Sequence, residues 1–370
     1  AKVAAGKTDQ SALFVYASFD RFLRDDGVLS FVITLSLFKS RAGGEGFRRF
    51  ACLSGKRFAP VVVEDLTKID VFPDTSNLPS VATFRASRQT QYPVKFVVWK
   101  PIEGKSFAPD TELVEVLSRV ERIAGEAVPV DPHDPTSPWL TLPTTVLSAV
   151  CKIVGQAAYR ARIGVNTGGA NSVFWVELVK ALRGDFVCIK NSRGPRLRIR
   201  QVVANVEANV VYPLLRGKDV ARWCAKPSGH ILLPYDPQEP KKAISEDQLK
   251  VRYPKAYDYL SQFRTILKGR REYARWKSKG PFYELYRIGP YTFSKCKVVW
   301  QHTGFSGLMR GAVVTSNCKV PIPDQKVILV PFESEDEAHY FCGLLNARIT
   351  AALLRGYLIL DAPPHILDYV

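Results

Sequence analysis

The chain has 370 residues, of which 46% are hydrophobic and 24% are charged. This composition indicates a globular chain with two or three domains and excludes a disordered one. Its 52 Lys and Arg residues outnumber 35 Asp and Glu residues, and the resulting net charge of +17 is typical of a protein that binds a polyanion, most often nucleic acid. No apolar run reaches the ~20 residues that a transmembrane helix needs, so no membrane association is expected.

Cysteine and histidine usage argues against a metal site. Seven cysteines lie far apart without a CxxC pair, and five histidines are isolated from one another. Widely spaced cysteines in odd number are typical of reduced thiols, so we expect a cytoplasmic location and neither disulfides nor zinc. The sequence begins at Ala1, and its single methionine is Met309. This indicates a piece of a longer protein.

The beginning of the chain predicts half of a doubly wound α/β unit. Residues 9–24 have helical apolar periodicity, with Asp9 as a suitable N-cap. Residues 28–38 form an apolar run typical of a buried strand in a parallel sheet. Further strands are expected at 58–66, 76–87 and 92–99, the last two as an antiparallel edge. The predicted fold class is therefore α/β.

Two stretches in this region have alternative interpretations. Residues 41–50 place three glycines beside three arginines. They would either cradle a phosphate or form a flexible loop that caps a helix. Asp74, Glu103 and Lys105 outline a PD…ExK nuclease site, in which two carboxylates hold Mg²⁺ and a lysine polarises water. Gly104, inside the ExK triplet, instead indicates a turn.

A Pro-rich stretch predicts the domain boundary. Residues 110–124 have the pattern of a helix, and residues 127–143 are typical of an extended linker. We therefore expect a first domain at 1–108, a helix and linker at 109–143, and a second, mixed α/β domain at 144–370.

The second domain contains an arginine row that suits phosphate contact. Arg196, Arg198 and Arg200 alternate in the sequence, so they would share one face of a strand. Such a row matches the spacing of a DNA backbone. A solvated edge strand that is protected by charge is the alternative.

The stretch 209–223 predicts a strand that delivers basic residues on a turn. The apolar run ends at Arg216, Gly217 allows a tight turn, and Lys218, Arg222 and Trp223 follow. Arginine and lysine on such a turn suit phosphate contact or readout of base edges. An ordinary strand, turn and helix with solvated charges is the alternative.

Basic and aromatic residues interleave between residues 264 and 297. Ten Lys or Arg residues accompany two acids there, and they include Lys268, Arg270 and Arg271 beside Trp276. This mixture suits backbone tracking combined with base stacking. The aromatic side chains would equally serve as core, and we expect that about half of them do.

Five stretches together resemble a known family. They are "DQSALFVYASFDRFLR", "VNTGGANSVFWVEL", "VYPLLRGKDVARW", "GPFYELYRIGPYTF" and "AHYFCGLLNARI". In this order they resemble the gamma-class adenine-N6 DNA methyltransferases of restriction-modification systems, the TaqI-type and type IIG-like enzymes. The resemblance covers nearly the whole chain. It implies the C-terminal half of a Rossmann-like methyltransferase domain, followed by a DNA target-recognition domain.

The resemblance implies methyl transfer from S-adenosyl-L-methionine to an adenine that is flipped out of double-stranded DNA. The family's Asn-Pro-Pro-aromatic motif and its glycine-rich cofactor loop are absent from this sequence, so the cofactor would be bound mainly by residues that this chain lacks. The segment "SVATFRAS" is similar to the one that stacks on the flipped base, which gives Phe84 that catalytic role. A fused or separate restriction nuclease is an expected partner. A DNA-binding specificity subunit without enzyme activity is the alternative function.

Overall fold

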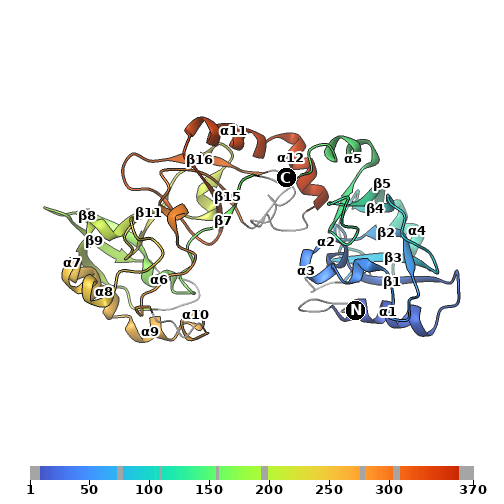
Figure 1. The fold of residues 1–370 in the computed structure, drawn as a ribbon, viewed down its shortest axis with the longest axis horizontal. Helices are drawn as coiled ribbons and strands as arrows, with labels where there is room; N and C mark the ends of the chain where they lie inside the picture. Colours follow the sequence, from blue (N-terminus) through green and yellow to red (C-terminus); the bar gives the residue numbers. More distant parts are fainter. Residues whose placement is uncertain are drawn as a thin grey trace. The chain divides into compact units, whose positions relative to one another are not determined.

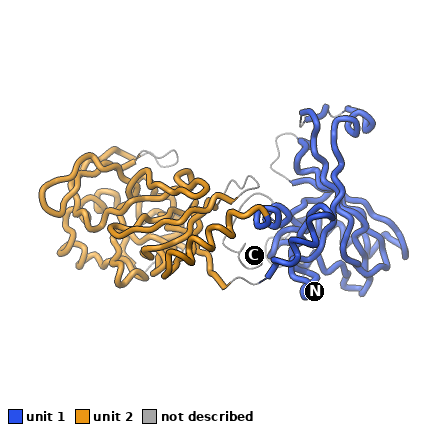
Figure 2. Tube along the Cα trace, turned by 90° about the horizontal axis from the view of Figure 1, so that it is seen from above, with its two compact units in different colours: residues 1–157, 349–359, 368–370 blue, residues 158–348, 360–367 orange. Residues whose placement is uncertain are grey.

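The computed structural model describes residues 9–72, 78–104, 106–108, 110–155, 158–192, 199–275, 280–302 and 309–357. Contacts divide these residues into two units. The first contains residues 9–157 and 349–357, and the second contains residues 158–348 (Figure 2). Both units combine helices with mixed sheets, which confirms the predicted α/β class (Figure 1).

The first unit is built on one six-stranded sheet. Its elements are α1 (Gln10–Arg21), β1 (Val28–Thr34), α2 (Ser36–Lys39), α3 (Arg41–Gly44), η1 (Phe47–Arg49), β2 (Phe58–Asp65), β3 (Pro79–Ala86), β4 (Val94–Pro101), α4 (Leu113–Ser118), β5 (Val120–Pro129), β6 (Trp139–Leu142), α5 (Thr144–Val150) and α12 (Arg348–Tyr357). The strand order is β1-β3-β2-β4-β5-β6. Among the described strands of this first unit, β2 and β4 pair in parallel and the other pairs are antiparallel.

Strand β1 differs from the expected buried parallel strand. It lies at the edge of the sheet and pairs antiparallel with β3, from Val28 opposite Arg85 to Thr34 opposite Pro79. Its side chains alternate, and Val28 and Val32 are each 52% exposed. Other elements cover an edge strand less completely than a central strand. The apolar run at residues 28–38 therefore did not mean that β1 is buried on both faces.

One face of this sheet carries an aromatic core that contains Phe84. The side chain of Phe84 is fully buried, with its ring centroid 5.6 Å from that of Phe58 and 6.1 Å from that of Phe19 on α1. Phe47 and Phe50 complete its surroundings. The predicted role of Phe84 in stacking on a base is therefore wrong for this structure, because no face of its ring is open to a ligand.

The expected linker belongs to the first unit. The whole of β4 pairs with residues 120–127 of β5, and β6 pairs with the end of β5, so β5 and β6 extend the sheet. Only α4, a single short helix, occupies the region where a longer helix was predicted. In β5 the apolar residues Val120, Ile123, Ala124 and Ala127 are spaced three, four and seven residues from the first, as in a helix, which explains the error.

Helix α12 returns to the first unit from the far end of the sequence. The Lys39 ammonium donates to the carbonyl of Gly356 at 2.8 Å, and Leu353 and Tyr357 are buried with Leu140. A Cβ at Gly356 would lie 2.7 Å from the Leu140 side chain, so glycine is needed for this close approach. Burial lowers the pKa of Lys39 to about 8.

The glycine-rich stretch 41–50 is structural. Arg48 is buried and donates through Nη1 to the carbonyls of Leu37 and Ser40, both at 2.8 Å. A Cβ at Gly44 would lie 2.2 Å from the Arg48 Nη1, so the glycine makes room for the guanidinium. The stretch is itself largely helical, with α3 at Arg41–Gly44 and η1 at Phe47–Arg49, so the expected flexible loop is wrong, and the buried Arg48 is engaged by carbonyls rather than open to a phosphate.

The second unit contains two larger sheets and a small two-stranded one. Its elements are β7 (Arg162–Ile163), α6 (Asn171–Phe174), β8 (Trp175–Ala181), β9 (Phe186–Asn191), β10 (Val203–Glu207), η2 (Ala208–Val210), β11 (Val211–Leu215), η3 (Gly217–Asp219), β12 (Val220–Ala221), β13 (Cys224–Ala225), β14 (Gly229–Leu232), α7 (Glu246–Arg252), α8 (Pro254–Ser261), α9 (Arg264–Lys268), α10 (Arg271–Arg275), η4 (Pro290–Phe293), β15 (Cys296–Gln301), β16 (Ala312–Thr315), β17 (Ile322–Pro323), β18 (Val327–Phe332) and α11 (Glu335–Leu345). The sheet orders are β10-β9-β8-β14-β11-β17, β16-β15-β18-β7 and β12-β13.

Each larger sheet has its own core. The six-stranded sheet packs on helices α6 to α9, with Tyr259 and Leu260 of α8 fully buried against it. The four-stranded sheet is covered by α11, which contacts β15, β16 and β18. In the part of the chain that the structure describes, no helix is both long and apolar enough to cross a membrane.

The burial of Phe84 generates a stability prediction. Phe84→Ala leaves a cavity in a packed aromatic cluster and is expected to lower the free energy of unfolding by about 3–5 kcal/mol. Urea denaturation measures this change. Val32→Ala, at a half-exposed position of the neighbouring strand, is the matched control and is expected to cost under ~1 kcal/mol. A Phe84→Ala protein as stable as this control would show that the ring is not part of the core.

Candidate nucleic-acid interface

The turn at residues 216–219 is placed by a parallel pair of strands. Strands β11 and β17 pair with Leu214 opposite Ile322 and Leu215 opposite Pro323. Parallel strands have their carboxyl ends at the same edge of a sheet. The turn after β11 therefore meets the turn at residues 324–326, which follows β17.

A cavity of about 390 Å³ lies where these two turns meet, and we call it the basic cavity. It is lined by Arg216, Gly217, Lys218, Gln301, Asp324 and Lys326. Gln301 fixes the first turn, since its Nε2 donates to the carbonyls of Gly217 and Val220 at 2.9 Å each. Three cationic side chains and one carboxylate thus surround a space that is large enough for a phosphate group.

Arg216 is held in position by its own neighbours. Its Nη2 donates to the carbonyl of Ser228 at 3.0 Å and to the Ser228 hydroxyl. Its Nε lies 3.6 Å from Asp219 Oδ2, and its guanidinium lies 5.7 Å from the centroid of the Trp175 ring. The Nε is buried without a hydrogen-bond partner. Arg216 is therefore oriented at the cavity wall, whereas Lys218 is exposed.

Asp324 gives the basic cavity a titratable group. Burial raises the pKa of its carboxyl to about 6, although Arg216 and the backbone N–H of Lys326, which donates to Oδ1 at 2.9 Å, oppose the shift. The cavity therefore becomes more positive as the pH falls through about 6.

Arg222 and Trp223 form an exposed pair after this turn. The Arg222 guanidinium lies 5.2 Å from the centroid of the Trp223 ring and donates to the carbonyl of Asn346 at 3.0 Å. Trp223 is 56% exposed, and its backbone has a φ of 69°, with its N–H donating to the Gly311 carbonyl. An indole held open to solvent beside a guanidinium is suited to stacking on a base.

Arg270 is not available for phosphate contact, which corrects its predicted role. It is 5% exposed, and its guanidinium donates to the carbonyls of Leu267, Thr167 and Phe282 at 2.8 to 2.9 Å. It thereby joins the turn after β7 to α9 and to the segment before η4. Its sequence neighbours Lys268 and Arg271 are exposed, as the prediction requires.

The other predicted residues have varied outcomes. Arg200 is exposed and donates to Gln262 Oε1 at 2.8 Å. Arg196, Arg198 and Trp276 lie outside the described residues, so their predicted roles stay predictions. Asp74 and Lys105 of the nuclease pattern also lie outside the described residues.

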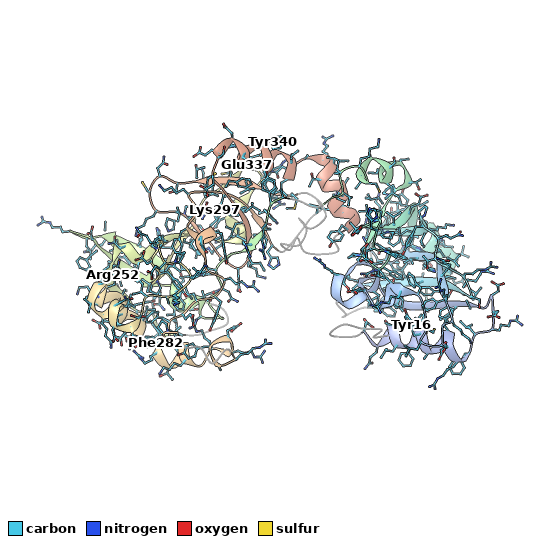
Figure 3. The ribbon with its side chains drawn as sticks, viewed as in Figure 1. Tyr16, Arg252, Phe282, Lys297, Glu337 and Tyr340 are labelled. Carbon is cyan, nitrogen blue, oxygen red and sulfur yellow. The ribbon has the colours of Figure 1, made fainter. Side chains whose placement is uncertain are left out.

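Much of the basic stretch 264–297 serves the interior. Lys297 (labelled in Figure 3) is fully buried and donates from Nζ to the carbonyls of Thr292 at 2.8 Å and Pro321 at 3.2 Å. Burial lowers its pKa to about 7. Arg264 pairs with Glu246 at 2.8 Å and stacks over Phe282. Phe282 and Tyr283 are core residues. The number of basic residues in the stretch 264–297 is therefore larger than the number that is exposed to solvent.

Sequence reasoning missed Gln301, Asp324 and Lys326. They belong to segments about a hundred residues after the Arg216 turn, and none forms a local motif. The parallel pairing of β11 with the two-residue strand β17 brings them there. A two-residue strand carries no periodicity, so no pattern in the sequence indicated this meeting.

Comparisons with known proteins bear on the fold. No protein-family model matches the sequence, and no curated protein sequence matches it. The type IIL restriction-modification enzyme MmeI, solved in complex with DNA, aligns over 97% of this chain and 39% of its own, with a TM-score of 0.50 and 8% identity. This chain shares its fold with part of a restriction-modification enzyme. The type IIG restriction endonuclease BpuSI aligns over 97% of this chain and 41% of its own, with a TM-score of 0.31 and 10% identity. The chain spans about two fifths of the length of both.

The contrast between Arg270 and Arg271 generates a prediction. Arg270→Met leaves three buried carbonyls without their donor and is expected to lower the free energy of unfolding by about 2–4 kcal/mol. Arg271→Met removes an exposed charge and is expected to change it by less than ~0.5 kcal/mol. Urea denaturation of both variants gives the comparison. Equal stability of the two variants would contradict the anchoring role of Arg270.

Proposed function

We propose that this chain is the DNA-binding part of a restriction-modification protein, and that the basic cavity is one of its phosphate contacts. The observation that carries the proposal is the fold match to MmeI, which extends over 97% of the chain and therefore includes both units. That enzyme was solved in complex with DNA. The net charge of +17 and the cations at the basic cavity support the same partner.

In this proposal, one set of residues contacts the phosphates of the duplex and another set contacts the bases. Lys218 and Lys326 at the basic cavity, with Arg200, Lys268 and Arg271, contact phosphates and set the position on the duplex. Arg216 and the Arg222–Trp223 pair read bases, with Arg216 worth ~1–3 kcal/mol of discrimination per bidentate contact. Arg196, Arg198 and Trp276 keep their predicted places at this interface.

The finer activity that we propose for the whole protein is adenine-N6 methylation with S-adenosyl-L-methionine, in the cytoplasm. The residues present in this chain do not fit that cofactor by themselves, since the sequence has no Asn-Pro-Pro-aromatic motif and no glycine-rich loop directly after a strand. The exposed edge of β1 offers a place for further strands of a catalytic sheet, because within the described chain it pairs with β3 alone. The isolated chain is therefore expected to bind DNA without methylating it.

A DNA-binding specificity subunit without enzyme activity is the second candidate. The two candidates differ in the gene upstream of Ala1. A reading frame that continues upstream through a glycine-rich loop and Asn-Pro-Pro-aromatic supports the methyltransferase. A start codon directly before Ala1 supports the subunit.

The proposed function is tested by the affinity of the chain for duplex DNA against salt concentration. Lys218→Ala and Lys326→Ala each remove one phosphate contact and are expected to reduce the slope of log K against log salt by ~1. Lys152→Ala, an exposed lysine of the first unit, is the matched control and is expected to leave the slope unchanged. Fluorescence anisotropy with a labelled duplex measures all four proteins. A parent chain without salt-dependent binding would rule out the proposed function.

The position of Asp324 generates a pH prediction. Its folded-state pKa of about 6 is raised above the usual value, so the carboxyl takes up a proton as the pH falls through about 6. This protonation removes a negative charge beside Arg216 and Lys326. DNA affinity is expected to rise several-fold as the pH falls from 7.5 to 5.5. The contribution of Asp324 to the free energy of unfolding is also expected to become more favourable as the pH falls.

Anisotropy titrations at both pH values check this expectation. Asp324→Asn is expected to bind with the higher affinity at both, because its side chain is neutral throughout. Asp185→Asn, at an exposed position of the β8–β9 turn, controls for the loss of one charge elsewhere in the second unit. The idea is wrong if Asp324→Asn retains the full pH dependence of the parent chain.

A further inference from the structure

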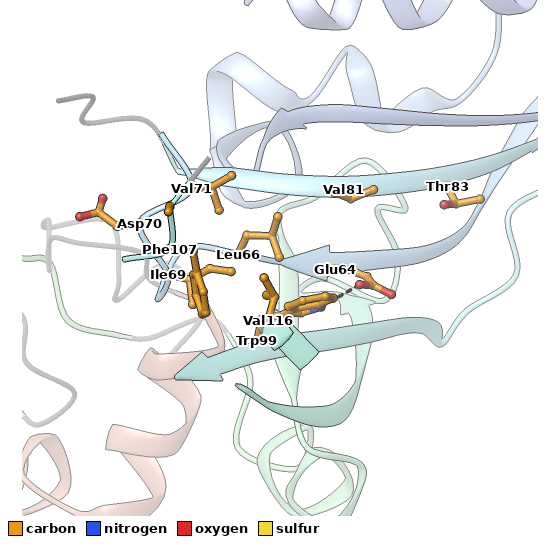
Figure 4. Close-up of a pocket in the computed structure, with 11 residues that line it drawn as sticks. Glu64, Leu66, Ile69, Asp70, Val71, Val81, Thr83, Trp99, Phe107 and Val116 are labelled. Atoms are coloured by element: carbon orange, nitrogen blue, oxygen red, sulfur yellow. Dashed lines mark hydrogen bonds between the residues drawn. The ribbon is translucent and has the colours of Figure 1, made fainter. Parts of the chain in front are cut away.

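The first unit contains an apolar pocket that the proposed DNA interface does not use. It has a volume of about 460 Å³, and Figure 4 shows the side chains that line it. The pocket lies on the sheet face opposite the Phe84 core. Val81 and Thr83 reach it from β3, since they alternate with the buried Ala82 and Phe84. Leu66 and Ile69 from the loop after β2, Phe107, and Val116 of α4 form the other walls.

One wall of the pocket is fixed by a polar triad. The Trp99 indole N–H donates to Glu64 Oε2 at 2.7 Å, and Arg122 donates to Glu64 Oε1 at 2.7 Å. The Arg122 guanidinium also lies 5.2 Å from the centroid of the Trp99 ring. The indole is therefore held in one orientation, and Figure 4 shows it beside Val116 and Leu66. A wall that is ordered in advance lowers the entropic cost of binding.

Exposed apolar side chains continue beyond the pocket. Helix α4 has no buried residue, and its Leu113 and Val114 are 65% and 75% exposed. Leu117 on the same helix is 40% exposed, and Ile102 at the end of β4 is 65% exposed. A small molecule that filled the pocket would leave these side chains in water. A polypeptide would cover both the pocket and this apolar rim.

The surface is acidic, although the chain as a whole is basic. The described residues of 66–72 and 102–119 include five acids and two bases, in a chain of net charge +17. Of the bases, Arg119 is already paired with Glu115 at 3.3 Å and stacks over Phe107 at 4.7 Å. Asp110 and Glu112 stand directly before Leu113. An occupant with positive charge beside its apolar side chains complements this surface.

We propose that the pocket and the α4 rim bind a basic amphipathic helix of a partner protein. One large apolar side chain enters the pocket, the rest of the apolar face covers Leu113, Val114 and Leu117, and Lys or Arg residues pair with Asp110 and Glu112. Strands β2, β3 and β4 each have neighbours on both sides, so this surface offers no free edge for a bound strand. A helix, which presents apolar side chains three and four residues apart, fits it.

Trp99 makes the binding directly observable. The chain, labelled with 5-fluorotryptophan, gives ¹⁹F signals from its six tryptophans, and Trp99→Phe assigns the one at the pocket. The probes are two designed helices of about 18 residues with the same apolar face. One carries lysines on its polar face and the other carries glutamates. The lysine peptide is expected to shift the Trp99 signal and to bind ~10-fold or more tightly than the glutamate peptide.

Substitutions at exposed positions test the surface without disturbing the fold. Leu113→Asp combined with Val114→Asp is expected to weaken the lysine peptide by ~10-fold or more. Leu53→Asp, at a 77% exposed leucine elsewhere in the first unit, is the matched control and is expected to have no effect. Asp110→Asn combined with Glu112→Gln is expected to reduce the preference for lysine while retaining the shift at Trp99. Circular dichroism of each variant confirms that it is folded.

Four results would overturn the proposal. The first is the absence of any shift at Trp99 with the lysine peptide, and the second is equal binding of the two peptides. The third is a concentration-dependent dimer, seen by sedimentation and abolished by the Leu113 and Val114 variant, which would assign the surface to a second copy of the chain. The fourth is a combined result, in which indole saturates the pocket and the Leu113 and Val114 variant binds the lysine peptide as tightly as the parent chain does. That result would identify the pocket as a small-molecule cavity.

Discussion

The second unit depends on the backbone of residues 322–327, where its two larger sheets meet. Strand β17 closes the six-stranded sheet, with the Asp324 N–H donating to the Leu215 carbonyl at 2.9 Å. Strand β18 begins directly afterwards and belongs to the other sheet. Gly164 approaches from β7, and a Cβ there would lie 2.3 Å from the Asp324 carbonyl oxygen. The same few residues join the sheets and form the basic cavity, so the position of the candidate phosphate contact is set by the core.

Buried cations are the second constraint on this chain. Arg48, Arg270, Lys39 and Lys297 all donate to backbone carbonyls, and burial lowers the pKa of each of them. Each of these side chains joins separate segments of the chain through such hydrogen bonds, as when Lys39 donates to the carbonyl of Gly356. Leaving such a charge unpaired in the interior would be costly, and the carbonyls supply the required acceptors. The net charge of the chain therefore exceeds the charge that a nucleic acid can reach.

The two units have different kinds of exposed surface. The second unit presents cations at the basic cavity and on α9 and α10, and it presents the open indole of Trp223. The first unit presents apolar side chains on α4 and at the edge strand β1, beside a cluster of acids. Under our two proposals, the first kind of surface contacts a polyanion and the second contacts a partner protein. A chain with both is suited to bringing a protein partner to a nucleic acid.

The sequence by itself determined the elements with strong local signals. The α/β class, the helix from Asp9 and the strand before Arg216 follow from periodicity and turn chemistry, which act within a few residues. The burial of Phe84 and Arg270, the inclusion of 120–142 in the first sheet and the meeting of Lys218 with Lys326 depended on tertiary structure. Burial and pairing between distant segments are decided by which surfaces pack together. A local pattern shows that a side chain is apolar or charged. The tertiary structure decides whether that side chain contacts water, a backbone carbonyl or a ligand.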